Sequence, residues 1–443
     1  MGAVDVADGS FVRGWAYDVD QRVSARVRIA VDGQLVGEVR GRDYRPDLAD
    51  AGLGDGRCGF AFRLPRRLRE RPFVVTARFT STGSLLIGGE RLVGGVQLAK
   101  AELFQSALAN GVWRIDSLRS SGDVTVLSGW GVPPYGVAMP VSLLRDGVLP
   151  LSFASVDRPD VAAFFGLETL NTRFGFEATF ASVDDEDGDH AYRFVSLHTS
   201  APFGGYQGIH YWRERLVMPD EGRRRRVAGT PDRDMFRRIG GTTYARLDRA
   251  LQQYFGRSFA DATAILDWGS GCGRVLRYVP ALQAVTGIDI DADNVAWCRE
   301  NIPGARFELV PLRPPTGLPS DTFDVAFGIS VMTHLTEENH HEWLAELQRV
   351  TAPGAAVLLT IHGEMAWLEG QLPLEQYARW RMRGYYVAGK NSDLDDSGAD
   401  ASLYYNTFVS RRYVFEEWSR YFEVLDVIPG AVFNQDLAVL RRR

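Results

Sequence analysis

Cysteine and long hydrophobic runs are scarce in this sequence, and each scarcity excludes a class of protein. Three cysteines among 443 residues cannot form a disulfide framework, so the chain fits a reducing compartment. No uncharged apolar run approaches the roughly 20 residues that a membrane helix needs. The opening stretch MGAVDVADGSFVRGW has no apolar centre of the kind that a signal peptide requires. We therefore expect a cytoplasmic protein without an integral membrane segment.

An excess of charge of one sign is also missing. The 50 basic and 56 acidic residues give a net charge of −6, which supplies no general reason to expect nucleic acid as a partner. The one basic run, residues 223–226, is short, and we interpret it as a solvated linker. Hydrophobic residues make up 45% of the chain, so it is globular, and its length predicts two or three domains.

The first half of the chain repeats a series of short motifs in the same order. The series reads Gly14-Trp15, Asp32-Gly33, Arg45-Pro46-Asp47 and Gly59-Phe60, and it returns as Gly129-Trp130, Asp146-Gly147, Arg158-Pro159-Asp160 and Gly175-Phe176. The offset between the two series is nearly constant, which indicates a duplicated unit about the size of a small domain. We expect each tryptophan to be a buried anchor and each Arg-Pro-Asp to begin a short helical turn.

Around these motifs, apolar and polar residues alternate as they do in strands, and Asp-Gly is a turn pair typical of hairpins. These patterns predict two small antiparallel β-sandwich modules, at residues 1–97 and 98–200, with a connecting helix over 100–109. We interpret residues 201–240 as a linker and lid helix. Helical spacing continues beyond residue 230, and we expect a break in it at Gly240-Gly241.

The last part of the chain, residues 241–443, alternates strand and helix patterns. We expect strands at 264–267, 284–288, 306–310, 323–328 and 356–361, helices at 274–282, 291–301 and 337–350, and a terminal pair of strands at 422–428 and 437–440. This alternation predicts a Rossmann-like α/β domain with a parallel sheet, helices on both faces and an antiparallel edge hairpin.

A glycine-rich turn follows the first of these strands, in the stretch ILDWGSGCGRV at residues 265–275. Glycines allow the backbone to turn sharply and to approach a ligand closely. Asp289 closes the next strand, where an acidic group can accept hydrogen bonds from both ribose hydroxyls of a nucleoside. The alternate glycines suit a nucleoside without phosphates better than a dinucleotide, although a dinucleotide oxidoreductase remains an alternative.

Residues from about 230 to 443 resemble the class I methyltransferases of bacteria that depend on S-adenosylmethionine (SAM). The resemblance rests on ILDWGSGCGRV, GIDID, FDVAFGISVMTHL and PGAAVLLTIHG in this order. It implies that the methionine part of SAM is surrounded by Asp267, Gly269, Ser270, Gly271 and Gly273. It also implies that Asp289 binds the ribose, that Ile290 packs on the adenine, and that Ser330 lines the cofactor site.

One departure from the family concerns the adenine. Many relatives carry an acidic residue just after the third strand, where this chain has Val310-Pro311-Leu312. Backbone groups around Leu312, or the side chain of Glu308, are then the candidates for adenine recognition. We read Cys272, within the loop, as a small side chain and not as a nucleophile.

Two histidines follow strands at the edge where open α/β sheets bind ligands. An oxygen acceptor often needs a base, and histidine is the usual one near neutral pH. We favour His362 for substrate contact or catalysis, and His334 for support of its loop, with a catalytic role as the alternative. Nothing in the sequence predicts a metal site.

Aromatic and polar residues follow a polar stretch, residues 389–401, that we expect to be a mobile loop. Tyr404, Tyr405 and Asn406 are candidate contacts to the methyl acceptor, because class I enzymes build an acceptor pocket or lid in this place. Packing of these aromatic residues in the core is the alternative interpretation.

The repeated modules suggest the acceptor by analogy alone. The run GWAYD…VDGQLVGEV…RDYRPDLADAG…GFAF resembles β-modules found beside enzymes of bacterial surface-polysaccharide assembly. The leading hypothesis is therefore O-methylation of a glycan or glycan-linked acceptor. The alternatives are methylation of a protein or a small metabolite, with the modules forming a homo-oligomer, and a non-catalytic SAM-binding scaffold.

Overall fold

The computed structural model divides into two compact units. One unit comprises Met1–Leu103 and Gln371–Arg383, and the other comprises Phe104–Gly370 and Gly384–Arg443. The structure describes residues 1–7, 10–65, 73–93, 108, 111–134, 140–165, 167, 172–182, 190–197, 209–211, 215–370, 372, 374–391 and 404–443. The helix expected over 100–109 and the loop expected over 389–401 lie mostly outside these residues.

The first unit is rich in β-structure. Its elements are β1 (Gly2–Ala7), β2 (Phe11–Asp18), β3 (Val23–Ser24), β4 (Arg26–Val31), β5 (Gln34–Arg40), α1 (Pro46–Asp50), β6 (Gly59–Arg63), β7 (Phe73–Phe79), β8 (Leu85–Val93) and α9 (Leu374–Arg383). The strands follow the order β3-β2-β1-β8-β7-β4-β5, and β6 pairs with β2. Alternate residues of these strands, such as Val27, Ile29 and Val31, are buried in one apolar core, as the period of a half-buried strand requires.

The second unit begins with another β-rich region. Its elements are β9 (Val112–Ser121), β10 (Val124–Val132), β11 (Val141–Arg145), β12 (Ser152–Val156), α3 (Pro159–Phe165), β13 (Gly175–Ala181), β14 (His190–Ser196) and β15 (Ile209–Tyr211). One sheet has the order β12-β13-β10-β9 and the other has the order β11-β14-β15. Phe176 of the first sheet and Phe194 of the second are 5.2 Å apart between ring centroids, so both sheets contribute to one core.

The repeated motifs make matching backbone contacts in the two regions. A Cβ atom on Gly14 would lie 2.2 Å from the Ala3 carbonyl oxygen, and one on Gly129 would lie 2.1 Å from that of Arg114. The Asp-Gly pairs also match, because Asp32 and Asp146 have φ angles of 47° and 53°. Asp is among the residues that tolerate this left-handed conformation. Each Gly-Trp glycine is thus required by the close approach of a neighbouring strand.

The Arg-Pro-Asp motifs begin short helices in both regions, as expected from the fixed φ of proline. Arg45 bonds Asp5 at 2.6 Å and Asp47 at 2.7 Å. Arg158 bonds Asp116 and Asp160 at the same two distances. Each arginine therefore ties the start of its short helix to a neighbouring strand.

The tryptophans of the repeat were expected to be buried anchors, and this expectation is wrong. Both Trp15 and Trp130 are half-buried. Trp15 packs beside Leu48 of α1, and Trp130 lies 6.1 Å from Phe165 of α3 between ring centroids. Each tryptophan thus packs beside its short helix and keeps part of its surface accessible to solvent.

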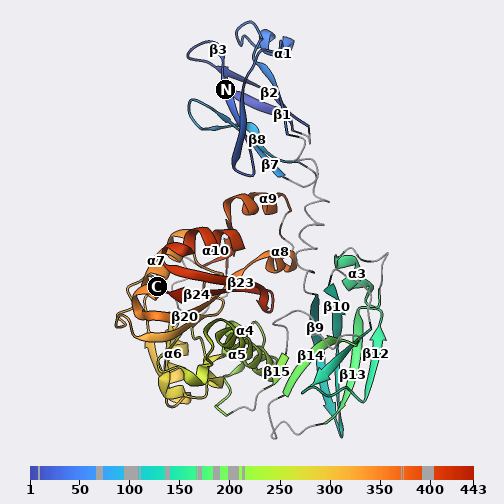
Figure 1. Cartoon of the computed structure of the whole chain (residues 1–443), viewed down its shortest axis with the longest axis vertical. Helices are drawn as coiled ribbons and strands as arrows, with labels where there is room; N and C mark the ends of the chain where they lie inside the picture. The colour runs from blue at the N-terminus through green and yellow to red at the C-terminus, as the bar shows by residue number, and fades with distance from the viewer. Residues whose placement is uncertain are drawn as a thin grey trace. The chain divides into compact units, whose positions relative to one another are not determined.

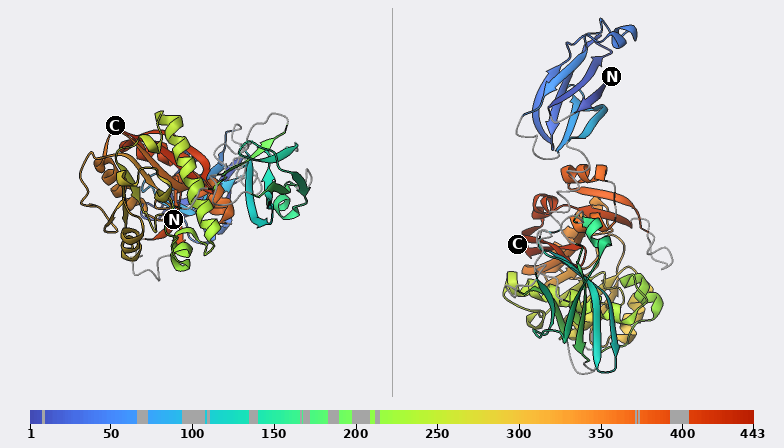
Figure 2. Two further views of the ribbon diagram at one scale, coloured as in Figure 1. Left: turned by 90° about the horizontal axis from the view of Figure 1, so that it is seen from below. Right: turned by 90° about the vertical axis from the view of Figure 1, so that its right-hand side faces the viewer.

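The remainder of the second unit is built on a seven-stranded sheet, and Figures 1 and 2 show this sheet among its helices. Its strands are β16 (Ile265–Trp268), β17 (Val285–Asp289), β18 (Arg306–Leu309), β19 (Phe323–Gly328), β20 (Thr351–His362), β23 (Phe422–Val432) and β24 (Gln435–Arg442). They have the order β18-β17-β16-β19-β20-β24-β23. The first five in this order are mutually parallel, and β24 pairs antiparallel with β20 and β23. The expected terminal antiparallel pair is confirmed.

Helices cover both faces of this sheet. The helices of this part of the chain are α4 (Glu221–Ala228), α5 (Arg233–Phe255), α6 (Ala292–Asn301), α7 (Glu337–Val350), α8 (Glu364–Glu369) and α10 (Arg411–Glu417). A small hairpin of β21 (Tyr385–Lys390) and β22 (Tyr405–Val409) lies apart from the sheet. Apolar residues of α5 and α6 share one core with the sheet, and those of α7 and α10 share another. The expected helix 337–350 is confirmed, and Trp343, Leu344 and Leu347 on its expected inner face are buried.

Two expected features of this region are wrong. Residues 274–282 were expected to form a helix, but the chain makes two short 3₁₀ turns, Leu276–Tyr278 and Leu282–Ala284. Pro280 lies between the turns, and proline has no N–H for a continuous helix. The expected break at Gly240-Gly241 is also missing, because α5 runs through both residues. A Cβ atom on Gly240 would lie 2.3 Å from the Arg274 carbonyl oxygen, so this glycine allows the helix to approach the glycine loop.

Among the described residues, no helix is both long enough and apolar enough to cross a membrane.

The close strand approach at Gly129 leads to a stability prediction. The change Gly129→Ala should lower the free energy of unfolding by about 1–3 kcal/mol, because the added methyl group forces β9 and β10 apart. The matched control is Gly389→Ala, where an added Cβ meets no atom within 4 Å. Calorimetric unfolding of the full chain measures both effects. Equal unfolding temperatures for the two variants would contradict the explanation.

Candidate functional site

A cavity of about 160 Å³ lies at the carboxyl ends of β16 to β19. The glycine loop after β16 forms one side of it, with φ angles of 74° at Gly269, 51° at Gly271 and 72° at Gly273. The backbone N–H groups of Gly269 and Ser270 both donate to the carbonyl oxygen of Ile288, at 2.8 and 3.1 Å. These bonds turn the loop toward the end of β17, in a conformation that favours glycine.

The carboxylate of Asp289 lies under this loop and lines the cavity. It accepts hydrogen bonds from the backbone N–H groups of Gly271 at 2.7 Å and Asp291 at 2.8 Å. Burial is the main influence on this carboxyl and raises its pKa. Two carboxylate oxygens offer about four acceptor positions, so Asp289 could accept further hydrogen bonds from a ligand.

Three residues expected to surround the cofactor do not line the cavity. The side chain of Asp267 is 3% exposed, and burial, together with nearby Asp289, raises its pKa well above the usual value. Ser270 is also buried. A Cβ atom on Gly273 would lie 2.3 Å from Cδ1 of Ile302. All three residues contribute to the shape of the loop.

The opposite side of the cavity is apolar. Its side chains come from the ends of β16, β17 and β18 and from α7 and the segment before it: Trp268, Ile290, Val310, Leu312, Leu335 and Trp343. The indole N–H of Trp343 donates to the Leu312 carbonyl oxygen at 3.2 Å, which holds the segment after β18. Leu312 is thus part of the lining, whereas Glu308, the alternative considered for adenine recognition, is not.

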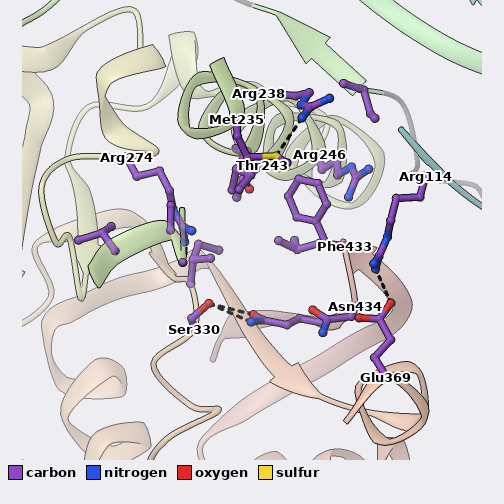
Figure 3. A pocket seen from close by; sticks show the side chains of 18 of the residues that line it. Arg114, Met235, Arg238, Thr243, Arg246, Arg274, Ser330, Glu369, Phe433 and Asn434 are labelled. Atoms are coloured by element: carbon purple, nitrogen blue, oxygen red, sulfur yellow. Dashed lines mark hydrogen bonds and ion pairs between the residues drawn. The ribbon is translucent and has the colours of Figure 1, made fainter. Parts of the chain in front are cut away.

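A second cavity of about 740 Å³ adjoins the first (Figure 3). Both are lined by Arg226, Val227, Arg274, Ile329, Ser330 and Tyr404. The larger cavity also reaches the β-rich region of the same unit, through β9 and β15. The glycine loop and the β-rich region thus line two adjoining cavities that share these six residues.

Ser330 lies where the two cavities meet, and its backbone is strained. Its φ angle is 61°, in the left-handed region that residues other than glycine rarely adopt. Its N–H donates to Thr360 Oγ1 at 2.8 Å, and its hydroxyl accepts from Gln435 Nε2 at 2.9 Å. Such strain is concentrated at functional sites.

The two candidate histidines lie close together but differ in their access to the cavities. His334 is 8% exposed and lines the larger cavity, whereas His362 lines neither. The Nδ1 atom of His334 is 3.1 Å from the Tyr405 carbonyl oxygen, and that of His362 is 3.2 Å from the Thr407 carbonyl oxygen. A carbonyl oxygen only accepts, so each Nδ1 carries the proton and each Nε2 keeps its lone pair.

Burial sets the charge of these histidines. It lowers the pKa of His334 to about 4, and burial together with the neighbouring His334 lowers the pKa of His362 to about 4 as well. Their ring centroids are 6.0 Å apart in an edge-to-face arrangement. Both rings are therefore neutral at pH 7.

Of the three candidate substrate residues, one lines the cavities and two do not. Tyr404 stacks on His334 with ring centroids 4.2 Å apart, and it lines both cavities. Tyr405 and Asn406 line neither cavity. Tyr405 donates its backbone N–H to the His334 carbonyl oxygen, and the Asn406 side chain accepts from Asn391 at 2.8 Å.

The basic run at residues 223–226 was expected to be a solvated linker, and this is wrong. The run lies in α4, where Arg223 and Arg226 bond Asp293 at 2.6 and 3.0 Å. A Cβ atom on Gly271 would lie 2.9 Å from Val227, so the helix packs directly over the glycine loop. Sequence reasoning missed the partner of the run, because Asp293 lies far along the chain.

Three further lining residues were missed: Arg238 and Arg246 on α5, and Arg274 directly after the glycine loop. A weak signal for Arg238 and Arg246 was present, because they are charged residues within the apolar pattern of a helix. They are 7% and 4% exposed, respectively.

Known proteins resemble this part of the chain. Residues 265–354 match the family model described as a methyltransferase domain. A SAM-dependent methyltransferase structure from Methanosarcina mazei has 18% identity and a TM-score of 0.30, covering 41% of this chain and 93% of that one. A Burkholderia thailandensis 1,6-didemethyltoxoflavin N1-methyltransferase with bound S-adenosylhomocysteine has 16% identity and a TM-score of 0.31, covering 45% of this chain and 79% of that one.

The N-methyltransferase NodS from Bradyrhizobium japonicum, solved with S-adenosylhomocysteine, is also similar, with 13% identity and a TM-score of 0.30. This comparison covers 45% of this chain and 85% of that one. The family match lies on the strands and loops that surround the smaller cavity. The chain therefore carries a methyltransferase domain at residues 265–354.

Proposed function

We propose that this enzyme transfers the methyl group of SAM to an oxygen atom of a glycan or glycan-linked acceptor. The observation that carries the proposal is the junction at Ser330, a residue that lines both the cavity at the strand ends and the larger cavity beside it. The larger cavity, at about 740 Å³, lies within the range of ligand pockets. Trp113 and Ile209 of the β-rich region line it, which supports a role for that region in holding the acceptor.

The residues of the smaller cavity fit the parts of SAM. Asp289 binds the ribose hydroxyls, and Ile290 and Leu312 contact the adenine within the apolar wall. Gly269 and Gly271 allow the cofactor to lie against the loop, and the guanidinium of Arg274, at the junction, binds the methionine carboxylate. When bound, SAM supplies an electrophilic methyl group on a sulfonium sulfur.

His334 is the base that we assign to the reaction. Its Nδ1–H is held by the Tyr405 carbonyl oxygen, which leaves Nε2 to accept the proton of the acceptor hydroxyl. That hydroxyl becomes strongly acidic as its oxygen bonds to the methyl carbon and the carbon–sulfur bond breaks. A neutral imidazole of low pKa is therefore a sufficient base. Tyr404, stacked on His334, and His362, packed against its edge, orient the ring.

The cofactor assignment predicts the effect of removing the carboxylate under the glycine loop. Asp289→Ala should weaken the binding of S-adenosylhomocysteine by about 10- to 100-fold, because hydrogen bonds to a charged group are lost. The control is Glu308→Gln, which removes a charge one strand away and outside the cavity, and should leave binding unchanged. Isothermal titration calorimetry measures both. Equal dissociation constants for Asp289→Ala and the unmodified protein would refute the assignment.

The assignment of the base predicts a loss of rate without a loss of cofactor binding. His334→Gln should lower kcat by about 100- to 10,000-fold, which is the usual contribution of a general base. His362→Gln should have a smaller effect. The assay follows transfer of labelled methyl groups to a panel of glycan and glycan-linked acceptors, with calorimetric binding of S-adenosylhomocysteine as the control. A larger loss of kcat in His362→Gln than in His334→Gln would mean that His362 is the base and that His334 orients it.

The buried state of His334 also predicts the pH dependence. Because burial lowers its pKa to about 4, the ring is unprotonated at higher pH, and the rate should fall only as the pH drops through about 4. An inflection near pH 6.5 that disappears in His334→Gln would contradict this. An inflection near pH 7 that persists in the variant would belong to Asp436, whose pKa burial raises to about 7. Circular dichroism at each pH confirms that the protein remains folded.

A further inference from the structure

Gln435, the first residue of β24, reaches the junction of the two cavities. Its side chain lines the larger cavity, and Ser330, to which it bonds, lines both. Gln435 Nε2 donates to the Ser330 hydroxyl at 2.9 Å, and that hydroxyl lies 3.3 Å from Gln435 Oε1. The side-chain amide of Gln435 is thus held at the border between the two cavities.

The amide of Gln435 has one hydrogen-bond donor left. An amide nitrogen carries two N–H groups. Ser330 uses one of them, and no other described residue bonds to Gln435 Nε2. Because Gln435 is half-buried and lines the larger cavity, its second N–H is available to a group inside that cavity.

The candidate base lies near this amide. Gln435 is the register partner of His362 between β24 and β20, and the ring centroid of His362 is 6.0 Å from that of His334. His334 lines the same cavity as Gln435, and Tyr404, which stacks on His334, lines both cavities. A hydrogen-bond acceptor, His334 Nε2, and a donor, Gln435 Nε2, therefore lie on the side of the larger cavity next to the junction.

A hydroxyl group and an amine differ in how they use such a pair of groups. The oxygen of a hydroxyl has one hydrogen and two lone pairs. It can donate to His334 Nε2, accept from Gln435 Nε2 and keep one lone pair for attack on a methyl group. The nitrogen of a neutral amine has a single lone pair, and the attack requires it. An amine therefore cannot accept a hydrogen bond from Gln435 while it reacts.

We propose that Gln435 holds the acceptor oxygen at the point of methyl transfer and selects hydroxyl acceptors over amines, and that Ser330 positions its amide. The oxygen forms a bond to the methyl carbon as the carbon–sulfur bond breaks, and the electron pair of that bond stays on sulfur. The proton of the hydroxyl passes to His334 Nε2. This inference rests on the proposed function, since it assumes that the larger cavity holds the acceptor.

The first test needs no acceptor, because it compares two ligands of the cofactor site. Sinefungin is a SAM analogue with an amino group in place of the methyl group that is transferred, and S-adenosylhomocysteine has no group there. Gln435→Glu places a carboxylate next to that amino group. It should tighten the binding of sinefungin relative to S-adenosylhomocysteine by about tenfold, because a charge-assisted hydrogen bond forms. Isothermal titration calorimetry of the full chain measures both dissociation constants.

The matched control is Asn434→Asp, which makes the same change of amide to carboxylate one residue earlier. Asn434 lines the larger cavity too, but it has no bond to Ser330 in the described structure. Figure 3 shows Ser330 and Asn434 on one side of this cavity, with Arg238 of α5 on the other. The control should leave the ratio of the two dissociation constants unchanged. An unchanged ratio in Gln435→Glu, or an equal change in Asn434→Asp, would overturn the inference.

The second test measures the choice of the acceptor atom. Transfer of labelled methyl groups is compared for pairs of glycosides in which an amino group replaces one hydroxyl group, at about pH 9, where such an amine is largely neutral. The unmodified protein should favour the hydroxyl by about 10- to 100-fold in kcat/KM, because an amine leaves the Gln435 N–H unpaired. Gln435→Met, which has no N–H, should lose this preference, and Gln435→Glu should favour the amine.

Both tests compare two ligands or two acceptors on the same variant, so a general loss of affinity or rate cancels. A purely structural role of Gln435 would lower kcat/KM equally for both acceptors. A hydroxyl preference that survives in Gln435→Met would overturn the inference and leave the proposed function standing. Failure of the unmodified protein to bind S-adenosylhomocysteine, or to methylate any hydroxyl of the panel, would count against the proposed function itself.

Discussion

The bond between the Gly271 N–H and the Asp289 carboxylate is the contact on which the candidate site depends. It joins the loop after β16 to the end of β17 at 2.7 Å, and two further N–H groups of the loop bind the Ile288 carbonyl oxygen. Val227 of α4 packs on Gly271, and α6 begins directly after Asp291. Helix α4, the loop and the two strand ends are therefore held as one assembly around the smaller cavity.

Burial has opposite consequences for the two kinds of basic side chain near the junction of the cavities. It lowers the pKa of His334 to about 4, so that the imidazole is neutral and keeps a lone pair. Burial lowers the pKa of Arg246 only to about 9, so that the guanidinium stays charged. The same desolvation thus produces a neutral proton acceptor and a fixed positive charge, because the ordinary pKa values of the two groups differ so widely.

The two copies of the repeat share a backbone contact, but they differ in the side chains beside it. Gly14 faces the carbonyl oxygen of Ala3, and Gly129 faces that of Arg114, so Ala3 and Arg114 occupy equivalent positions. In the second copy, Trp113 and Arg114 line the larger cavity. The residues at the same places in the first copy are Gly2 and Ala3, which lack the aromatic and charged groups. One framework has therefore acquired different side chains in its two copies.

The sequence by itself determined the positions of most strands along the chain, the glycine turn, the acidic residue at the end of β17 and the duplicated motifs. Each of these depends on short-range rules, namely the period of the apolar residues, the freedom of glycine and the preference of Asp-Gly for turns. The sequence also indicated the two histidines, because both follow strands at the edge of the sheet where ligands bind.

Only the tertiary structure decided how these parts meet. It replaced the expected helix at 274–282 by two short turns, and it kept α5 continuous through Gly240, where Arg274 comes close. It paired the basic run with Asp293 and brought Arg238 and Arg246 into one cavity. These features arise from contacts between residues far apart in the chain, which no local pattern specifies. His334 lines the larger cavity and His362 does not. This difference also arises from contacts between residues far apart in the chain.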